Sequence, residues 1–459
     1  MAWNIVIAGG GFGGLYAARR LERVLPRQGA RLTIVTDSNF LLYTPLLPGA
    51  AAGTLEPRHV VVPLRDQLAD TDVRLGEVTG ADPDRQALHY TTADGRAIEL
   101  SYDKLVVALG SVSRVLPIPG LAEHAFGFKT LADAIALRNR AVACLETAES
   151  IDDPDERRKW LTFVFVGAGY AGVEGVAELQ DYVADLIRRY PRCRVDGTRW
   201  ILVDAQQRIM SEIPARAAEF ATRELQRRGI EIRTSTRLDR VDASSVTLSG
   251  GEEIASRTLC WTAGVRPAPV VARLGLPLAV DGRIAVDSSL RVDGRGDVWA
   301  IGDCAAVPDP AKHGAIACPP TAQHAVRQGR LAADNVAASV GHGGERPFRY
   351  KTRGVFVDLG RYKAVAAMMG LNVNGLPAWF AARTYHLALM PGTARRVRLV
   401  TDWTVGLLFG RDSSDLGQLG HPASLGSYLE RDGSPDGTPA AAVAAAAPGN
   451  GAPPPPPRA

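Results

Sequence analysis

The sequence contains few cysteines, and none of them has the paired spacing that carries redox chemistry. Its five cysteines occur singly, without a CxxC or CxxxxC pair, at Cys144, Cys193, Cys260, Cys304 and Cys318. With this spacing we expect neither a disulfide framework nor a redox-active dithiol. Electrons would therefore have to pass through a bound cofactor. We expect at least four of these side chains to be small buried hydrophobes. The role of Cys318, which precedes a helix start, stays open.

Long apolar runs and the common catalytic arrangements are also missing. No apolar run reaches the roughly 20 residues that span a bilayer, and the sequence shows no P-loop, Ser-His-Asp arrangement or metal-ligand spacing. A formal net charge of +4 over 459 residues is too mild to indicate a nucleic-acid binder. We expect no signal peptide, because an apolar strand begins almost at Met1 without a basic leader. These absences favour a cytoplasmic α/β protein that depends on a cofactor.

A glycine fingerprint of the form GxGxxG occurs twice. Gly9, Gly11 and Gly14 follow Ile5-Val6-Ile7-Ala8, and the second copy follows Phe163-Val164-Phe165-Val166 with Gly167, Gly169 and Gly172. Each copy lies between a predicted buried strand and a segment with helical apolar spacing, which is the context that the motif requires. The first glycine permits the tight turn, the second admits a pyrophosphate, and the third lets helix and strand pack closely. Two dinucleotides are therefore expected to bind.

Other predicted strands end at residues suited to hold these dinucleotides. The strand 32–35 ends at Thr36 and Asp37, where one of the two side chains would meet a ribose hydroxyl, and the sequence leaves open which one. The strand 105–110 closes on Gly110, and its counterpart in the second half closes on Gly264. We interpret these as matched strand ends, where each nucleotide-binding unit joins the rest of the chain.

A third strand end suits a flavin. The run 297–303 reads as a strand that ends in Gly302-Asp303, and Pro319-Pro320-Thr321-Ala322-Gln323 reads as a capped helix start. Asp303 could accept hydrogen bonds from ribityl hydroxyls. A turn carboxylate is the alternative, but the position of Asp303 directly after a strand favours the functional interpretation. The positive end of the helix could stabilise negative charge on a reduced isoalloxazine ring.

These motifs together resemble the two-dinucleotide-binding flavoproteins and, among them, the type II NADH dehydrogenases, which are single-subunit NADH:quinone oxidoreductases that do not pump protons. The resemblance covers nearly all of residues 3–425 and is most specific in three segments. These are the run 40–48 with Tyr43-Thr44-Pro45, the run Gly172-Val173-Glu174 with Glu178, and the run 319–323. Arg327 stands where the family often has a second glutamine, so quinone contacts in that turn could differ.

The resemblance implies a cofactor, a substrate and a set of site residues. The first fingerprint would hold one non-covalent FAD, the second would hold NADH as substrate, and the helix start at 322–323 would lie beside the flavin and the quinone. Glu174 and Gln323 are the implied catalytic residues. The implied FAD contacts are Gly9, Gly11, Gly14, Asp37, Pro45, Val78, Ala108, Gly110, Asp303 and Ala322, and the implied NADH contacts are Gly167, Gly169, Gly172, Asp204 and Gly264.

Charge favours NADH over NADPH at the second fingerprint. The strand 200–203 ends at Asp204, where a carboxylate would accept a hydrogen bond from the 2′-hydroxyl and repel a 2′-phosphate. Arg208 lies close enough in sequence to offset part of this repulsion. Glu174 and Glu178 share one face of the next helix. The resemblance brings Glu174 near the nicotinamide and the flavin, whereas Glu178 needs no role beyond complementing the helix dipole.

The C-terminal region combines basic and apolar residues. Residues 351–411 contain nine Lys/Arg and two Asp, interleaved with aromatic and aliphatic side chains. This mixture is typical of a helix in an anionic membrane surface, and a homodimer interface or core packing is the competing interpretation. Because a quinone partitions into lipid, we expect peripheral attachment at the cytoplasmic face of the cell membrane. The Ala/Pro-rich end lacks the apolar variety of a core and is predicted to be disordered.

The predicted architecture is an α/β fold with two Rossmann-like domains, the first interrupted by the second. It divides into an FAD domain at 1–112 and 271–340, an NADH domain at 113–270, a quinone- and membrane-facing region at 341–430 and a disordered tail at 431–459. The predicted function is respiratory electron transport from NADH through FAD to menaquinone or ubiquinone. The alternatives are a related flavoprotein reductase with a protein acceptor, and an NADH-responsive flavin sensor with little turnover. A sulfide:quinone oxidoreductase would need paired redox cysteines, and no cysteine follows Cys318.

Overall fold

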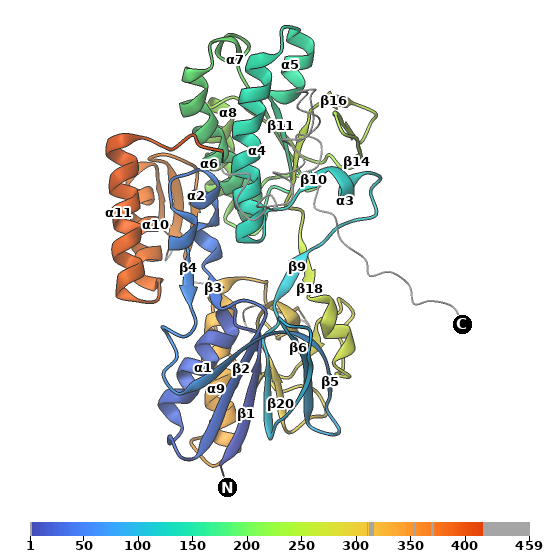
Figure 1. Ribbon diagram of the computed structural model, residues 1–459, viewed down its shortest axis with the longest axis vertical. Coiled ribbons are helices and arrows are strands. Elements are labelled where there is room, and N and C mark those ends of the chain that lie inside the picture. Colours follow the sequence, from blue (N-terminus) through green and yellow to red (C-terminus); the bar gives the residue numbers. More distant parts are fainter. Residues whose placement is uncertain (1, 310, 312–315, 352–353, 369–370, 416–459) are drawn as a thin grey trace, which may run out of the picture.

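The computed structural model describes residues 2–309, 311, 316–351, 354–368 and 371–415, and they form two lobes with a smaller C-terminal layer at one side (Figure 1). The lower lobe in that view contains a seven-stranded sheet. Five neighbouring strands are parallel, and two antiparallel strands extend the sheet at one edge. In spatial order the strands are β20 (Val298–Ala300), β8 (Lys104–Val107), β1 (Trp3–Ala8), β2 (Ala30–Thr36), β5 (Thr71–Asp82), β6 (Ala87–Thr92) and β7 (Ala97–Ser101).

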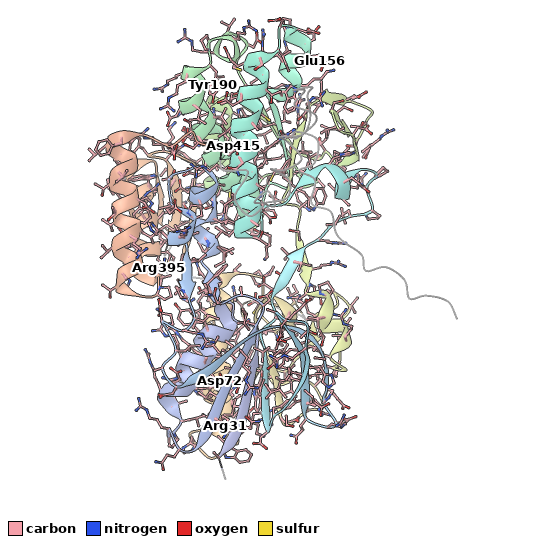
Figure 2. All side chains as sticks on the ribbon, in the orientation of Figure 1. Arg31, Asp72, Glu156, Tyr190, Arg395 and Asp415 are labelled. Carbon is pink, nitrogen blue, oxygen red and sulfur yellow. The ribbon has the colours of Figure 1, made fainter. Side chains whose placement is uncertain are left out.

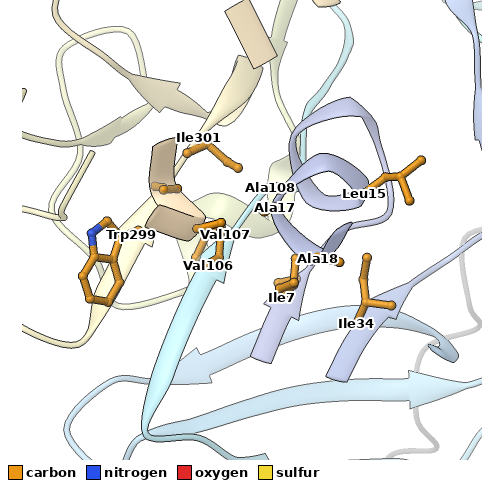
Figure 3. Close-up of a cluster of buried hydrophobic side chains, with 14 of the residues drawn as sticks. Ile7, Leu15, Ala17, Ala18, Ile34, Val106, Val107, Ala108, Trp299 and Ile301 are labelled. Carbon is orange, nitrogen blue, oxygen red and sulfur yellow. The ribbon is translucent and has the colours of Figure 1, made fainter. Parts of the chain in front are cut away.

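Two helices that lie far apart in the sequence pack together beside this sheet. They are α1 (Phe12–Val24) and α9 (Ala322–Ser339). Figure 3 shows Leu15 and Ala18 of α1 among the strand side chains Ile7 and Ile34, in a core whose members are fully buried. The two helices approach closely, because a Cβ added to Gly329 of α9 would lie 2.3 Å from the carbonyl oxygen of Gly13.

The second lobe contains a five-stranded parallel sheet. Its strands, in spatial order, are β10 (Ala125–Phe126), β17 (Thr258–Trp261), β11 (Thr162–Val166), β12 (Arg199–Val203) and β13 (Ile230–Arg233). The β-branched and aromatic residues of β11 and β12 are buried on both faces, as expected of a parallel sheet covered by helices. Phe163 and Trp200 stack with ring centroids 4.3 Å apart.

Helices and a small antiparallel sheet complete the second lobe. The helices are α3 (Leu121–His124), α4 (Leu131–Ser150), α5 (Pro154–Trp160), α6 (Tyr170–Leu186), α7 (Pro191–Asp196) and α8 (Ala215–Arg227). The small sheet contains β14 (Leu238–Val241), β15 (Ser245–Leu248) and β16 (Glu253–Ala255). Part of the first lobe also reaches this region, since α2 (Leu47–Ala51) packs against α4 and α6.

The chain crosses between the lobes on two paired strands. β9 (Ser111–Ser113) leaves the first lobe after β8, and β18 (Val265–Pro267) returns after β17. They pair antiparallel with Val265 opposite Ser113, and Figure 1 shows them between the two lobes. The second sheet is thus inserted into the first lobe, which confirms the predicted fold class. The remaining short strands are β3 (Phe40–Leu42), β4 (Val61–Pro63), β19 (Ile284–Ala285) and β21 (Ala305–Ala306).

The C-terminal layer differs from the surface helix that the sequence suggested. It begins with an antiparallel sheet of β22 (Gly354–Asp358), β23 (Ala364–Met368) and β24 (Leu371–Asn374), and continues with α10 (Leu376–Leu389) and α11 (Thr393–Phe409). The small residues of β23 have a low strand propensity, so tertiary packing against α10 decides the strand. The chain then returns to the second lobe, where Tyr182 of α6 and Arg138 of α4 donate to the carbonyl of Asp412 at 2.8 and 3.3 Å. The predicted tail at 431–459 lies outside the described residues.

The contact between α1 and α9 predicts a large effect for one methyl group. Gly329→Ala would force backbone against backbone, so we expect the free energy of unfolding to fall by about 1–3 kcal/mol or more. Gly406→Ala on α11 is the matched control, because its Cβ would meet nothing within 4 Å and alanine favours a helix by about 0.5–1 kcal/mol. Urea unfolding followed by circular dichroism measures both, and equal stability of the two variants would contradict the close contact.

Candidate functional site

The two fingerprints form the same backbone turn. Gly9 and Gly167 have φ of +107° and +104°, a region that favours glycine. A Cβ on Gly14 would lie 1.8 Å from the carbonyl oxygen of Gly9, and a Cβ on Gly172 would lie 1.8 Å from that of Gly167. No side chain fits at these contacts, so each glycine lets a helix begin directly against the turn that precedes it.

The middle glycine of each motif faces open space. Gly11 and Gly169 are the N-cap residues of α1 and α6, and neither helix has a side-chain cap. A Cβ on either glycine would meet nothing within 4 Å. The first backbone N–H groups of both helices therefore lie next to free volume at the positive end of a helix dipole, which suits a pyrophosphate. We call the turn at Gly9, Gly11 and Gly14 the first cradle and the turn at Gly167, Gly169 and Gly172 the second cradle. Both cradles fit the dinucleotides that the sequence implied.

Strand register shows which residue of the first motif is equivalent to Asp204 of the second. Ala8, the residue before the first glycine of the first motif, pairs with Val35. Val166, its equivalent in the second motif, pairs with Val203. The next residues, Thr36 and Asp204, are therefore equivalent. Thr36 is buried beside the fingerprint turn, and its Oγ1 would lie 2.6 Å from a Cβ on Gly10. Asp37 is exposed. The implied contact Asp37 lies one residue beyond the equivalent position.

Asp204 is held against the second fingerprint. Its carboxylate accepts hydrogen bonds from the backbone N–H groups of Ala168 and Gln206, the latter at 2.7 Å. Arg208 forms no ion pair with Asp204 among the described residues, and its guanidinium donates to carbonyl oxygens of the following turn, including that of Ser211 at 2.7 Å. The edge of the second cradle therefore presents a carboxylate.

The strand ends predicted to close each cradle lie beside the glycines. The carbonyl oxygen of Ala108 would be 2.3 Å from a Cβ on Gly9, so these two segments touch. Gly110 and Gly264 have φ of +67° and +93° and face open space. Val78 follows Leu75, the partner of Thr36 in the sheet, and so lies just past the end of β2 at the same edge.

Asp303 lies between the two lobes in a polar cluster. Its carboxylate accepts a hydrogen bond from Ser111 at 2.6 Å and lies 3.7 Å from the ammonium group of Lys129, which also donates to Ser111 at 3.0 Å. The preceding Gly302 donates its N–H to the buried side chain of Gln328 at 2.8 Å. The structure thus adds Ser111 and Lys129 to the site, and neither residue belongs to a motif that could have revealed it.

The predicted helix start at 319–323 is the beginning of α9. Thr321 is the N-cap, and its side chain accepts from the N–H of His324. Gln323 is held in place, because its Oε1 accepts from the Tyr350 hydroxyl at 2.7 Å and its Nε2 donates to the carbonyl of Gly354 at 3.3 Å. Arg327, at the family's second glutamine position, lies with its guanidinium carbon 4.0 Å from the Tyr350 ring centroid.

A pocket lies where the first lobe, α6 and the C-terminal layer meet. It brings together Glu174 and Pro45, two of the implied site residues, with side chains from β22, α10 and α11. Its lining comprises Pro45, Leu46, Pro48, Gly49, Thr54, Leu55, Glu174, Glu178, Phe356, Asp358, Ala382, Arg383, His386 and Trp403. In the part of the chain that the structure describes, His386 Nδ1 and Arg383 Nε are buried without a hydrogen-bond partner.

Two carboxyl groups of this pocket have raised pKa values. Burial raises the pKa of Glu174 well above its usual range, and it raises the pKa of Asp358 to about 7 with help from the charge of Glu178. Burial also lowers the pKa of His386 to about 4, so this imidazole is neutral at pH 7. The dipole role suggested for Glu178 is wrong, because α6 begins at Tyr170 and its first turn contains no acidic residue. Glu178 is only 2% exposed and pairs with Arg411 at 3.4 Å.

The cysteines take no part in the site. All five are free and buried. Burial raises the pKa of the Cys318 thiol to about 11, and its Sγ lies 3.7 Å from the carbonyl of Pro308. Cys318 is therefore a buried thiol with little thiolate at neutral pH.

Comparison with known proteins agrees with this geometry. The family model for pyridine nucleotide-disulphide oxidoreductases matches residues 3–329. The chain is 30% identical to the type II NADH:quinone oxidoreductase Ndh of Mycobacterium tuberculosis, over 89% of each chain. It is 29% identical to the demethylphylloquinone reductase NdbB of Synechocystis, over 87% of this chain and 95% of the relative. NDH2 of Plasmodium falciparum, solved with NADH, has a similar fold with a TM-score of 0.81 at 17% identity, over 90% of this chain and 100% of that one.

The register argument yields a prediction for the first cradle. Thr36→Ala removes a hydroxyl that could bond the ribose of FAD, so we expect FAD to bind roughly two- to tenfold more weakly, as for the loss of a neutral hydrogen bond of about 0.5–1.5 kcal/mol. Asp37→Ala is the matched control and should change the dissociation constant less than about twofold. Fluorescence of released flavin measures both. A larger loss of FAD binding in Asp37→Ala than in Thr36→Ala would assign the ribose contact to Asp37.

Proposed function

We propose, from the premise that this chain belongs to the type II NADH:quinone oxidoreductases of the pyridine nucleotide-disulphide oxidoreductase family, that it moves electrons from NADH through FAD to a quinone at a membrane surface. The oxidation of NADH by a quinone follows from the family. The identity of the flavin as FAD, the residues of each site and the attachment to the membrane are the proposed parts. The observation that carries the proposal is the pair of equivalent glycine turns, each with open space at the start of its helix.

NADH is assigned to the second cradle. Gly167, Gly169 and Gly172 shape its turn, Asp204 lies at the ribose position, and Gly264 faces the open volume at the matched strand end. The carboxylate of Asp204 accepts a 2′-hydroxyl and repels a 2′-phosphate. Since Arg208 is committed to backbone carbonyls, no guanidinium from that residue compensates for a phosphate.

FAD is assigned to the first cradle and to the polar cluster at Asp303. The pyrophosphate would lie on the N–H groups that begin α1 at Gly11, and the ribityl chain would meet Asp303 and Ser111. When bound, FAD supplies a two-electron acceptor that can be oxidised again by a quinone. The ammonium group of Lys129 and the start of α9 at Ala322 and Gln323 place positive potential where the bound flavin would gain negative charge.

A quinone fits the pocket at the junction. Phe356 and Trp403 provide apolar and aromatic surface, and His386 and Arg383 have buried nitrogen atoms without partners among the described residues, which could contact quinone oxygens. The mixture of aromatic surface and a few buried polar groups favours a quinone over the protein acceptor considered from the sequence.

Attachment to the membrane is assigned to α10 and α11. Exposed apolar side chains gather there, with Phe380 on α10 and Val397, Leu408 and Phe409 on α11 from 58% to 81% exposed. Arginines accompany them, and Figure 2 labels Arg395 on α11. Such a helix can lie in an anionic surface, and we place that surface at the cytoplasmic face of the membrane. Within the described residues, no helix combines the length and the apolarity needed to cross a bilayer. The homodimer stays a prediction.

Stopped-flow measurement of the flavin absorbance tests the electron path. We expect NADH to bleach the flavin rapidly and a menaquinone or ubiquinone analogue to restore it. Asp204→Ala should weaken NADH binding by roughly ten- to hundredfold, as for the loss of a hydrogen bond to a charged group of about 1.5–3 kcal/mol, and should narrow the preference over NADPH. Bleaching without recovery would redirect the proposal to a protein acceptor or a sensor, and no bleaching would overturn the assignment of the second cradle.

Vesicle sedimentation tests the membrane surface. Leu408→Glu places a charge on a side chain that is 71% exposed, so we expect binding to phosphatidylglycerol vesicles to fall by roughly tenfold or more. Val280→Glu is the matched control, because Val280 is fully exposed but lies far along the chain from α11. Equal loss of binding in both variants would contradict a surface at α11, as would unchanged binding of the Leu408→Glu protein.

A further inference from the structure

The pocket at the junction contains three carboxyl groups from two elements. Glu174 and Glu178 come from α6, and Asp358 ends β22. All three line the pocket, and the backbone N–H of Asp358 donates to Glu174 at 2.9 Å. The three groups therefore lie at one pocket, where Glu178 is buried and Glu174 and Asp358 are partly buried. A role for them in catalysis rests on the proposed function of this pocket as the quinone site.

Two of the carboxyl groups have a cation and the third has none. Arg411 lies 3.4 Å from Glu178, and both side chains are nearly inaccessible, with exposed fractions of 5% and 3%. Arg383 lies 3.1 Å from Asp358. Among the ion pairs of the described residues, none includes Glu174. Three acids thus face two guanidinium groups, and the neutral His386 adds no charge. Asp181, which lies near Glu178 and Arg411, is balanced by Arg228 at 2.8 Å and leaves this count unchanged.

An excess carboxyl in such a pocket keeps a proton. Carboxylates that are close together and poorly solvated cannot all ionise near neutral pH, because each charge raises the pKa of its neighbours. Burial raises the pKa of Glu174, and the charges of Asp358 and Glu178 add to this effect, although the hydrogen bond from the Asp358 N–H lowers it. Burial and the charge of Glu178 raise the pKa of Asp358 to about 7. The retained proton therefore belongs to the pair of Glu174 and Asp358 rather than to the Glu178–Arg411 pair.

We propose that Glu174 and Asp358 share one exchangeable proton, and that this pair supplies a proton to the quinone as it is reduced. The net reaction converts NADH, one proton and a quinone into NAD⁺ and a quinol. The hydride of NADH carries two electrons and one of the two hydrogens that form the quinol O–H bonds. The second hydrogen comes from the pair, and solvent returns a proton to the pair afterwards. Asp358 is thus assigned a part in proton supply that no sequence motif indicated.

Arg383 acts as the positioning residue of this pair. Its guanidinium carbon lies 3.6 Å from the ring centroid of Trp379 and 5.5 Å from that of Trp403, so two indoles hold it beside Asp358. This cation lowers the pKa of Asp358, against the effect of burial. Arg383 therefore keeps the shared proton exchangeable near neutral pH, where an unpaired buried carboxyl would bind it too tightly.

The test compares variants that change the charge balance in opposite directions. Asp358→Asn leaves two acids with two guanidinium groups, so Glu174 should ionise more readily and lose its proton at lower pH. The rate of flavin reoxidation by a menaquinone analogue, which falls as pH rises through the pKa of the pair, should then fall from a pH about one to three units lower. At pH 7.5 this corresponds to roughly tenfold slower reoxidation or more, with flavin reduction by NADH unchanged. Arg383→Gln should move this fall in the reoxidation rate, called the rate limb below, to higher pH.

Infrared difference spectra of the purified holoenzyme supply a readout that needs no turnover. We expect a carboxylic acid C=O band that titrates near pH 7 in the wild type, shifts to lower pH in Asp358→Asn and shifts to higher pH in Arg383→Gln. Asp196→Asn is the matched control, because Asp196 pairs with Arg157 on the far side of the second lobe and should leave both the band and the rate limb in place.

The outcomes separate this proposal from the proposed function. A band and a rate limb that do not move in Asp358→Asn, or that move the same way in both pocket variants, would overturn the shared proton. A wild-type protein that NADH reduces but no quinone reoxidises would refute the quinone site, and the titrating band would still decide whether the two carboxyl groups share a proton. If Asp358→Asn does not fold, the direction of the shift in Arg383→Gln decides the matter.

Discussion

The contact between a helix and the turn that precedes it determines the rest of this structure. A side chain at Gly14 or Gly172 would overlap the carbonyl oxygen of Gly9 or Gly167, with the Cβ only 1.8 Å away. Because these positions are glycine, α1 and α6 begin directly at the ends of β1 and β11 and aim their N–H groups at open volume. Each cradle thereby has a positive helix end and no side chain in the way of a phosphate. The same requirement, met twice, gives one chain two nucleotide sites.

The two cradles can cooperate only because the lobes are joined closely. The paired strands β9 and β18 connect the carboxyl ends of both sheets, so Ser111 at one end of β9 reaches Asp303 while the chain continues to the second lobe. Helix α9 is fixed against α1 by the contact at Gly329, which sets where Gln323 begins the helix. The junction pocket then forms between α2, α6 and the C-terminal layer. The electron path from one site to the next therefore depends on backbone packing.

Local patterns in the sequence were enough to predict both sheets, both fingerprints and the start of α9, because each depends on residues close together in the chain. The sequence could not decide between Thr36 and Asp37, since that choice depends on how β2 pairs with β1. It also misjudged Glu178, whose partner Arg411 lies 233 positions away. Lys129, Asp358 and Arg383 belong to no motif, and only the folded chain brings them to the site. The sheet of β22 and β23 was missed because alanine dominates β23 and tertiary packing supplies its stability.

The C-terminal layer serves two surfaces with different electrostatic needs. Residues 351–411 contain only two acidic residues, and both face inward. Asp358 meets Arg383 in the pocket, and Asp402 accepts from His59 at 2.7 Å and from the backbone N–H of Glu56 at 3.1 Å. The outer face of α11 therefore combines exposed apolar side chains with arginines and no acid, which favours an anionic lipid surface. The inner face holds Asp358, the carboxyl assigned to the proposed proton supply. Because the same strand and helices carry both faces, the proposed function would let a quinone leave the lipid and enter the pocket beside Glu174 and Asp358.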